Sequence, residues 1–211
     1  MTRRFVTTLA CAALLAATAL LPLSAVADAR AALDRFLQGL ETYSAEFSQT
    51  LTDETGFVLQ EAEGRFSIGL PDRLRWELDA PFEQQIVADG EYLWIHDPEL
   101  RQATVRPVDQ ALDATPLALL TQPHRLDEQF AVEEEAVPEG WRLVLRPRAP
   151  DADFTLLEVD LGTEDELLGL AFMDVFGQRT EIHLQEAQRN PVLAPGEFRF
   201  TPPPGTDVYR P

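Results

Sequence analysis

Hydrophobic and polar residues alternate one by one along much of this chain, which is the pattern of strands with one buried face. Leu74, Trp76 and Leu78 fall on one side of such a segment, and charged residues fall between them. This period of two predicts a half-buried strand. The dipeptide Asp89-Gly90 supplies the positive-φ turn that folds the next strand back as a hairpin.

Further segments repeat this alternation, and mostly short turns join them, so the sequence predicts an antiparallel sheet. The expected strands are Tyr43 to Thr52, Phe57 to Ile68, Leu74 to Ala80, Gln84 to Ala88, Glu91 to Asp97, Arg101 to Arg106, Val132 to Ala136, Trp141 to Arg148, Phe154 to Leu161, Leu167 to Asp174 and Thr180 to Arg189.

Two or three segments predict helices instead. Residues Asp28 to Leu40 are amphipathic, because their apolar residues recur at helical spacing: Leu33, Phe36, Leu37 and Leu40. Asp109 to Leu120 breaks the strand pattern, with Thr115 placed to cap and Pro116 at the first position of a short apolar helix. A further helical turn is expected around Asp127 to Phe130.

The fold class is therefore mainly β (α+β). About ten or eleven antiparallel strands with only two or three helices predict a strongly curved sheet or an unclosed antiparallel β-barrel (half-barrel), with the N-terminal helix and the short helices covering one mouth. A closed barrel would not need Leu117 to Leu120 on a helix, whereas an open one would use them as a lid. From spacing alone, ordinary core packing of these leucines is the favoured alternative.

The first 27 residues have the features of a cleavable secretory signal. Arg3 and Arg4 precede an apolar stretch, and Ala25-Val26-Ala27 is a small-x-small cleavage site. Cleavage would leave 211 − 27 = 184 residues, 28 to 211, which suits a single domain. The only cysteine, Cys11, would leave with the signal. We therefore expect a soluble periplasmic protein without disulfides.

The net charge of the mature chain restricts the classes of molecule that it can bind. The full chain has 17 basic and 36 acidic residues; without Arg3 and Arg4 the balance is 15 − 36 = −21. So negative a chain repels phosphate-rich polymers, and we expect no nucleic-acid partner. Every basic residue is arginine.

Enzyme chemistry has little support in the sequence. No serine lies in a Gly-x-Ser-x-Gly motif, and no cysteine follows the signal. His96, His124 and His183 lie far apart, without the spacing of metal ligands. Glu133 to Glu135 is best interpreted as a solvated strand edge that discourages aggregation. We expect no catalytic residues, no metal site and no cofactor.

An ordered series of short motifs resembles one family over essentially the whole mature chain. The series is Gly64-x-Phe66, Pro71, Arg75-Trp76, Pro81, Asp89-Gly90, Leu93-Trp94, Asp97-Pro98, Thr115-Pro116-Leu117, Leu119-Leu120 and Phe198-Arg199-Phe200-Thr201-Pro202-Pro203 with Gly205. It is similar to the LolA family of periplasmic carriers of outer-membrane lipoproteins.

The resemblance implies that helices cover an incomplete barrel and that the space between them binds acyl chains, which reverses the preference for ordinary core packing. The candidates for lining this space are Leu74, Trp76, Ile86, Trp94, Leu117, Leu120, Phe172 and Met173. The resemblance further implies acylated lipoproteins as cargo, an inner-membrane ATP-driven lipoprotein-releasing (ABC) transporter as donor and an outer-membrane lipoprotein receptor as acceptor. We expect a monomer.

One position departs from the family pattern. The residue before the strand-breaking Pro71 is usually an arginine that bonds the lid; here it is Leu70. Arg73 or Arg75 could replace that contact, because an arginine fork reaches several carbonyls. Otherwise apolar packing alone holds the lid, or the protein is a paralogue with different cargo. The lid and latch candidates are Leu70, Arg73, Arg75, Thr115, Pro116 and Leu119.

Two rival functions share these features. A carrier or sensor of another lipid or glycolipid could use the same half-barrel. An adaptor that binds peptides at an open sheet edge would also be rich in strands and acidic residues. An apolar dye separates them, because only a lidded cavity should bind it stoichiometrically.

Overall fold

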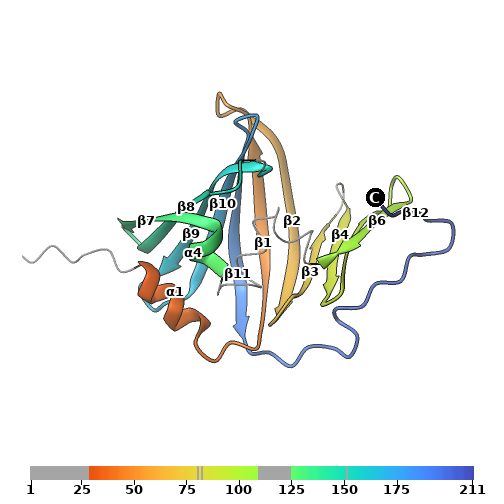
Figure 1. Cartoon of the computed structure of the whole chain (residues 1–211), viewed down its shortest axis with the longest axis horizontal. Coiled ribbons are helices and arrows are strands. Elements are labelled where there is room, and N and C mark those ends of the chain that lie inside the picture. Colours follow the sequence, from red (N-terminus) through yellow and green to blue (C-terminus); the bar gives the residue numbers. More distant parts are fainter. Residues whose placement is uncertain (1–28, 80, 82, 109–124, 151) are drawn as a thin grey trace, which may run out of the picture.

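A computed structural model describes residues 29–79, 81, 83–108, 125–150 and 152–211. Its strands form one twelve-stranded sheet in the order β12-β6-β5-β4-β3-β2-β1-β11-β10-β9-β8-β7. Figure 1 shows this sheet curved into an open half-barrel, with β7 and β12 at opposite edges. The elements are α1 (Ala29–Leu37), β1 (Thr42–Thr52), β2 (Val58–Gly69), β3 (Arg73–Leu78), β4 (Gln84–Asp89), β5 (Tyr92–Asp97), β6 (Gln102–Pro107), α4 (Leu126–Gln129), β7 (Phe130–Val137), β8 (Gly140–Pro147), β9 (Phe154–Gly162), β10 (Leu167–Asp174), β11 (Arg179–Arg189) and β12 (Asp207–Tyr209).

The sheet consists of two meanders that meet at its centre. β1 to β6 run outward from the centre to one flank, and β7 to β11 run inward from the other flank. The two halves join where β1 pairs antiparallel with β11. Each neighbouring pair is antiparallel except β12, which adds to β6 in parallel.

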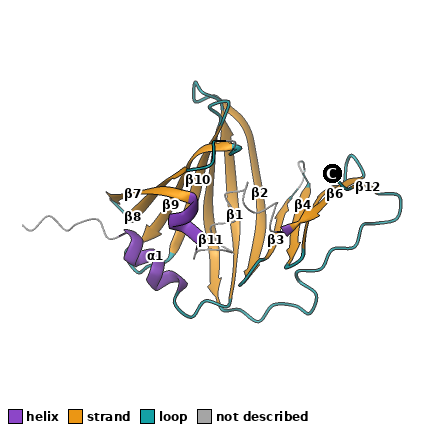
Figure 2. Ribbon diagram, viewed as in Figure 1, coloured by secondary structure: helices purple, strands orange, loops and turns teal. Residues whose placement is uncertain are grey.

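One face of the sheet carries a continuous apolar core. Its strand registers place Phe47 opposite Gly64, Phe66 opposite Trp76 and Trp76 opposite Ile86. α1 packs on β7, β8 and β9, and its buried residues belong to the same core. We call this the inner face; Figure 2 shows the helix α1 in purple beside the strands.

The opposite, outer face of β3 to β6 is covered by the C-terminal segment, residues 190–211. Phe200 packs on Trp94 and on His96, with ring centroids 5.4 and 5.2 Å apart. β12 then pairs with the outer edge of β6. The edge that a peptide-binding adaptor would leave open on this flank is therefore occupied by the protein's own chain.

The predicted hairpin turn at Asp89-Gly90 is confirmed. Gly90 has a φ of +100°, a backbone angle that a residue with a Cβ adopts only with strain. The Asp89 carboxylate accepts hydrogen bonds from the backbone N–H of Glu91 and Tyr92, at 2.8 Å each. This local network fixes the register between β4 and β5.

The structure confirms the unclosed, mainly β fold and corrects three details of it. The sheet has twelve strands, since the proline-rich tail adds β12. The first helix ends at Leu37 instead of Leu40, and a turn follows it. The extra helical turn is α4, of four residues, and it precedes β7. The expected signal, residues 1–27, and the expected lid helix, within residues 109–120, lie outside the described residues.

Candidate functional site

Three of the candidate lining residues meet on the inner face of β3 and β4. Leu74 and Trp76 alternate along β3, and the register places Trp76 opposite Ile86 on β4. Leu74 is fully buried, Trp76 is 4% exposed, and Ile86 is half-buried. Apolar side chains therefore line this flank of the half-barrel from the turn after β2 to the middle of β4.

Trp76 is the centre of an aromatic cluster that sequence reasoning did not list. It stacks on Phe47 of β1 at a centroid distance of 4.0 Å and on Phe66 of β2 at 5.5 Å. Tyr43 continues the row towards Phe36 of α1 at 5.2 Å. The alternation of Tyr43, Ala45 and Phe47 is the signal that identifies this face of β1.

Phe172 extends the inner face into the second meander. It lies opposite Leu157 of β9 and Thr180 of β11 and packs, half-buried, against the core. The two meanders thus present one continuous apolar surface, with its centre at the seam of β1 and β11.

Two other candidates lie on the outer face. Trp94 pairs with Val87 and Val105 and packs on Phe200, so it belongs to the small core under the C-terminal segment. Met173 follows Phe172 directly in β10 and therefore points to the opposite face. β5 and β10 carry apolar residues on both faces, which is why alternation alone selected the wrong side for these two residues.

The latch candidates Arg73 and Arg75 also lie on the outer face, between the inner-facing residues of β3. Arg75 donates to the Glu77 carboxylate at 2.8 Å and to the carbonyl oxygen of Glu197 at 3.2 Å. The Arg73 guanidinium lies 5.3 Å from the ring centroid of Phe198. In this structure, both arginines contact the C-terminal segment.

Leu70 takes a different position from the two arginines. It lies in the turn between β2 and β3, half-buried, and packs against the inner core. The remaining candidates, Thr115, Pro116, Leu117, Leu119 and Leu120, lie outside the described residues.

Tyr43 is a buried titratable group on the inner face, next to α1. Its side chain is 3% exposed. Burial raises the pKa of its hydroxyl to about 12, with a smaller contribution of the same sign from Glu166, while Arg189 opposes the shift. Tyr43 therefore stays neutral at physiological pH, as an apolar surface requires.

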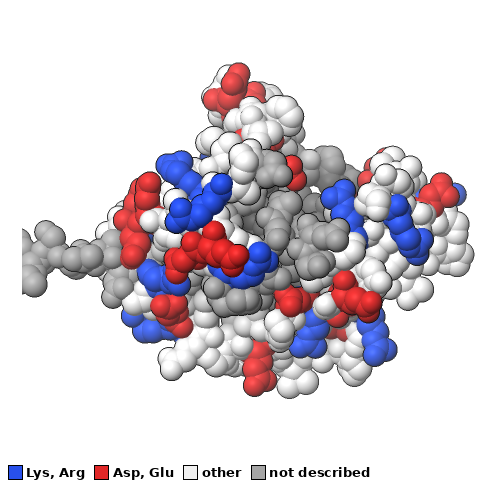
Figure 3. All heavy atoms as spheres, in the orientation of Figure 1, with Lys and Arg blue, Asp and Glu red and all other residues white. Residues whose placement is uncertain are grey.

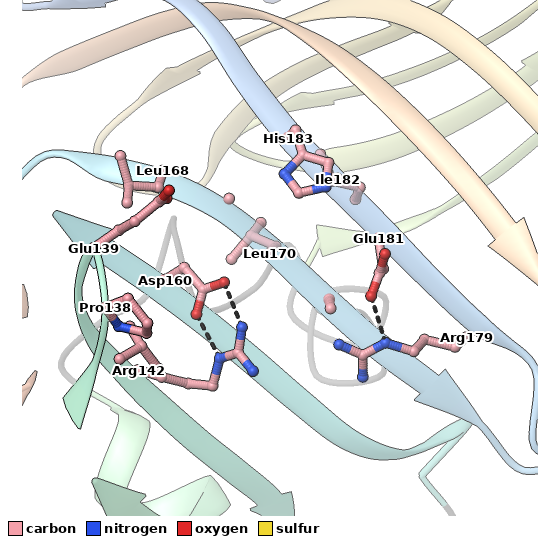
Figure 4. A pocket seen from close by; sticks show the side chains of 13 residues that line it. Pro138, Glu139, Arg142, Asp160, Leu168, Leu170, Arg179, Glu181, Ile182 and His183 are labelled. Atoms are coloured by element: carbon pink, nitrogen blue, oxygen red, sulfur yellow. Dashed lines mark hydrogen bonds and ion pairs between the residues drawn. The ribbon is translucent and has the colours of Figure 1, made fainter. Parts of the chain in front are cut away.

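The outer face of β8 to β11 carries a group of charged side chains (Figure 4). Arg142 forms a bidentate pair with Asp160 at 2.6 and 2.8 Å, and Arg179 bonds Glu158 at 2.6 Å and Glu181 at 2.8 Å. The hydrogen bonds to Asp160 raise the pKa of Arg142 above its usual value, so it stays charged. We call these two arginines and their three carboxylate partners the arginine ladder. It borders a hollow of about 260 Å³ whose wall includes Leu168, Pro138 and His183.

Within the described residues, no group of three or more His, Cys, Asp or Glu side chains could hold a metal ion. His96 is 5% exposed and lies under Phe200, and His183 is on the outer face of β11. Among the described helices none has the length and apolar character that crossing a bilayer requires.

Comparison with known proteins gives a consistent result. The family model "Outer membrane lipoprotein carrier protein LolA" matches residues 38–201. An outer-membrane lipoprotein carrier protein of Dechloromonas aromatica is 41% identical over 191 residues, covering 90% of this chain and 91% of that protein. One from Xanthomonas campestris is 41% identical over 196 residues, covering 91% and 93%.

A solved structure supports the fold. An uncharacterized conserved protein from Thermus thermophilus superposes with a TM-score of 0.51 at 16% identity, covering 87% of this chain and 98% of that one.

Proposed function

The chain belongs to the LolA family of outer membrane lipoprotein carrier proteins and is a periplasmic, non-enzymatic carrier; we propose that it binds the acyl chains of its cargo on the inner face of the half-barrel. We further propose that residues 1–27 are a cleaved signal and that 28–211 form a single carrier domain. The carrier takes lipoproteins from an inner-membrane ABC transporter and delivers them to an outer-membrane receptor.

The observation that carries the proposal is the continuous apolar inner face. Acyl chains of a lipoprotein contain tens of methylene groups, and exposing each to water costs about 0.8 kcal/mol, so free diffusion would cost on the order of 30 kcal/mol. A carrier without nucleotide must cover this surface and still release it. Ile86 and Phe172 are half-buried on the inner face, and together with the buried Trp76 they supply apolar contact without a polar anchor.

In the proposed site, Leu74, Trp76, Ile86 and Phe172 contact the acyl chains. Leu117 and Leu120 complete the lining, and Thr115, Pro116 and Leu119 belong to the lid. Leu70 holds that lid by apolar packing, because Arg73 and Arg75 are engaged by the C-terminal segment. Single changes of Arg73 and Arg75 to Leu should then leave cargo release unaltered; slowed release in either variant would assign the latch to that arginine.

The test of the whole function is release from spheroplasts. The purified secreted protein is mixed with spheroplasts that synthesise labelled outer-membrane lipoproteins, with a known carrier in parallel. Labelled lipoprotein should appear in the soluble fraction as a one-to-one complex. If the known carrier releases lipoproteins and this protein does not, the lipoprotein cargo is wrong and another lipid becomes the candidate.

A further inference from the structure

Two hairpin tips lie side by side at one end of the sheet. One joins β1 to β2 and the other joins β10 to β11, and Thr52 of β1 pairs with both Val58 and Arg179. A Cβ built on Gly177 would stand 3.5 Å from the Cβ of Glu54, so the two tips are in contact. We call residues 53–59 and 174–178 the paired tips; Figure 1 shows them projecting at the top of the molecule.

The paired tips expose five large apolar side chains. Phe176 is 79% exposed and Phe57 is 68% exposed, and the other three are Val58, Leu59 and Val175. Hairpin tips normally carry polar residues, because these positions face water. Contiguous apolar residues at such a position indicate a contact surface.

The same pattern of hydrogen bonds, from backbone N–H groups to an aspartate carboxylate, fixes the turn in each tip. The Asp53 carboxylate accepts hydrogen bonds from the backbone N–H of Thr55 and Phe57, at 2.8 and 3.0 Å. The Asp174 carboxylate accepts from Phe176 and Gln178, at 2.8 and 2.9 Å. These bonds fix the turns without burying the phenyl rings, so the exposed rings do not owe their position to core packing.

The tips also extend past one neighbouring flank. β2 has twelve residues and β3 has six, and the pairing stops at Gly64 opposite Leu78. The residues of β2 before Gly64 therefore reach roughly 20 Å beyond β3 at about 3.3 Å per residue. A projecting apolar tip fits a deformable surface better than it fits a flat protein face.

The inner face leads directly to the tips. Phe172 and Leu51 lie on either side of Thr180 in adjacent strands, and each stands two residues before the aspartate that begins its tip. An acyl chain that leaves the inner face along this row meets Asp53 and Asp174 next, and the backbone N–H groups of their own turns already bind both carboxylates.

We propose that the paired tips touch the surface of a phospholipid bilayer, so that acyl chains pass between the inner face and the membrane region along the Leu51 and Phe172 row. This inference rests on the proposed function, because it assigns the exit of the same acyl-chain site. The paired tips contain acidic residues and no arginine, and the whole chain is strongly acidic. The matching surface is therefore zwitterionic lipid; in Figure 3 the projecting tip is mainly white with acidic side chains at its end.

The test uses secreted protein without cargo, residues 28–211, which has no cysteine of its own, with one new cysteine labelled with an environment-sensitive dye. Val175→Cys places the label on a tip. Val192→Cys is the matched control, because Val192 is an equally apolar, fully exposed residue of the C-terminal segment. Phosphatidylcholine vesicles should raise the emission of the tip label severalfold and leave the control unchanged, and added phosphatidylglycerol should reduce the response at low salt.

Function is then tested with Phe57→Ser and Phe176→Ser, with Val192→Ser as control. The tip variants should release lipoproteins from spheroplasts as the parent does but transfer them to membranes several times more slowly. Equal emission changes at both labels, or none at either, would overturn the proposal. Slower transfer by the tip variants without any vesicle response would overturn it too and make a protein the partner. Failed release by the parent protein would instead count against the proposed function.

Discussion

At the scale of single residues, the direction in which a side chain points decides its role in this protein. Adjacent residues of one strand serve two different surfaces, the apolar inner face and the outer face under the C-terminal segment or the arginine ladder. β10 offers the clearest comparison, because Phe172 and Met173 are neighbours, are similarly half-buried and lie on opposite faces.

Phe172→Ser should therefore weaken binding of an apolar dye or of acylated cargo by several fold, whereas Met173→Ser should leave binding close to that of the parent. Both changes remove a partly buried apolar side chain, so both cost stability, by about 1–3 kcal/mol. Dye titration at a temperature where both variants are folded measures the difference. Equal weakening in the two variants would show that binding does not distinguish the faces.

Arg75 has a structural role that its neighbour Arg73 lacks. Glu77 has a side chain only 7% exposed, and Arg75 and Arg65 are its cationic partners. Arg75→Leu leaves that carboxylate with one partner and should lower the free energy of unfolding by about 1–3 kcal/mol. Arg73→Leu should cost less than about 1 kcal/mol, since it removes an exposed contact with the Phe198 ring and a long, exposed hydrogen bond of 3.5 Å to the Leu70 carbonyl.

A double-mutant cycle checks the cause of the Arg75 effect. In a Glu77→Gln background the cost of Arg75→Leu should shrink, as measured by urea unfolding. An unchanged cost would place the effect in the bond to the Glu197 carbonyl instead.

Tyr43 gives the protein a pH dependence on the alkaline side. Its pKa is raised from 10.0 to about 12 in the folded state. Between the pKa of Tyr43 in the unfolded chain and its pKa in the folded protein, only the unfolded chain ionises. The contribution of the neutral hydroxyl to the free energy of unfolding is therefore fully present below the unfolded pKa and is lost as pH rises to the folded pKa. Tyr43→Phe should therefore reduce the decline of unfolding free energy between about pH 10 and pH 12, by at most about 2 kcal/mol. Thermal unfolding across that range measures it; parallel curves for parent and variant would contradict the assignment.

At the scale of elements, the alternating pattern predicted the strands well, because each half-buried strand has its own period-two signal. The ends of β1, β2 and β9 fall within one residue of the expected positions. The pattern did not predict which face was inner for β5, since Leu93 and Ile95 on one side and Trp94 on the other are all apolar. β12 was missed because three residues after a proline-rich stretch carry no periodic signal.

The contacts between side chains in the candidate site could not be predicted from the local sequence pattern either, because they join segments that are distant in the chain. The stacking of Trp76 on Phe47 joins strands that are separated in the chain by β2. It depends on the register of two ladders, which turn residues and long-range packing determine together. Binding of Arg75 to the Glu197 carbonyl also depends on where the tail lies, and no motif specifies that.

β12 protects the sheet from association with other chains. It covers the β6 edge by pairing with Gln102, Ala103 and Thr104. Deleting residues 206–211 should leave that edge unpaired, cost about 1–3 kcal/mol of stability and produce concentration-dependent association. Sedimentation analysis checks this, with deletion of residues 210–211 alone as the control; a monomeric 206–211 deletion at high concentration would contradict it.

At the scale of the whole molecule, charged side chains lie on the surface and the inner face is apolar. Figure 3 shows acidic and basic side chains intermixed over the face in view, while the inner face holds the aromatic cluster. The excess of acid remains large, with 36 acidic residues against 17 basic ones. This excess favours solubility but repels itself in the folded state.

Raising the ionic strength should therefore stabilise the protein. Moving from about 0.01 M to about 0.15 M salt shortens the screening length from about 30 Å to about 8 Å, which weakens long-range repulsion more than the close ion pairs of the outer face. The unfolding temperature should rise over this range, as calorimetry in sodium chloride would measure. A fall would mean that the arginine ladder contributes more than the net repulsion costs.

The two-meander arrangement also determines when the molecule can be completed during synthesis. The strands from β1 to β6 emerge first, yet their two borders are covered by β11 and β12, which belong to the last part of the chain. Until those residues have been made, the early half has unpaired ladder edges on both sides. Chains that stop before β11 should therefore leave both edges open to association and be removed as unfolded chains.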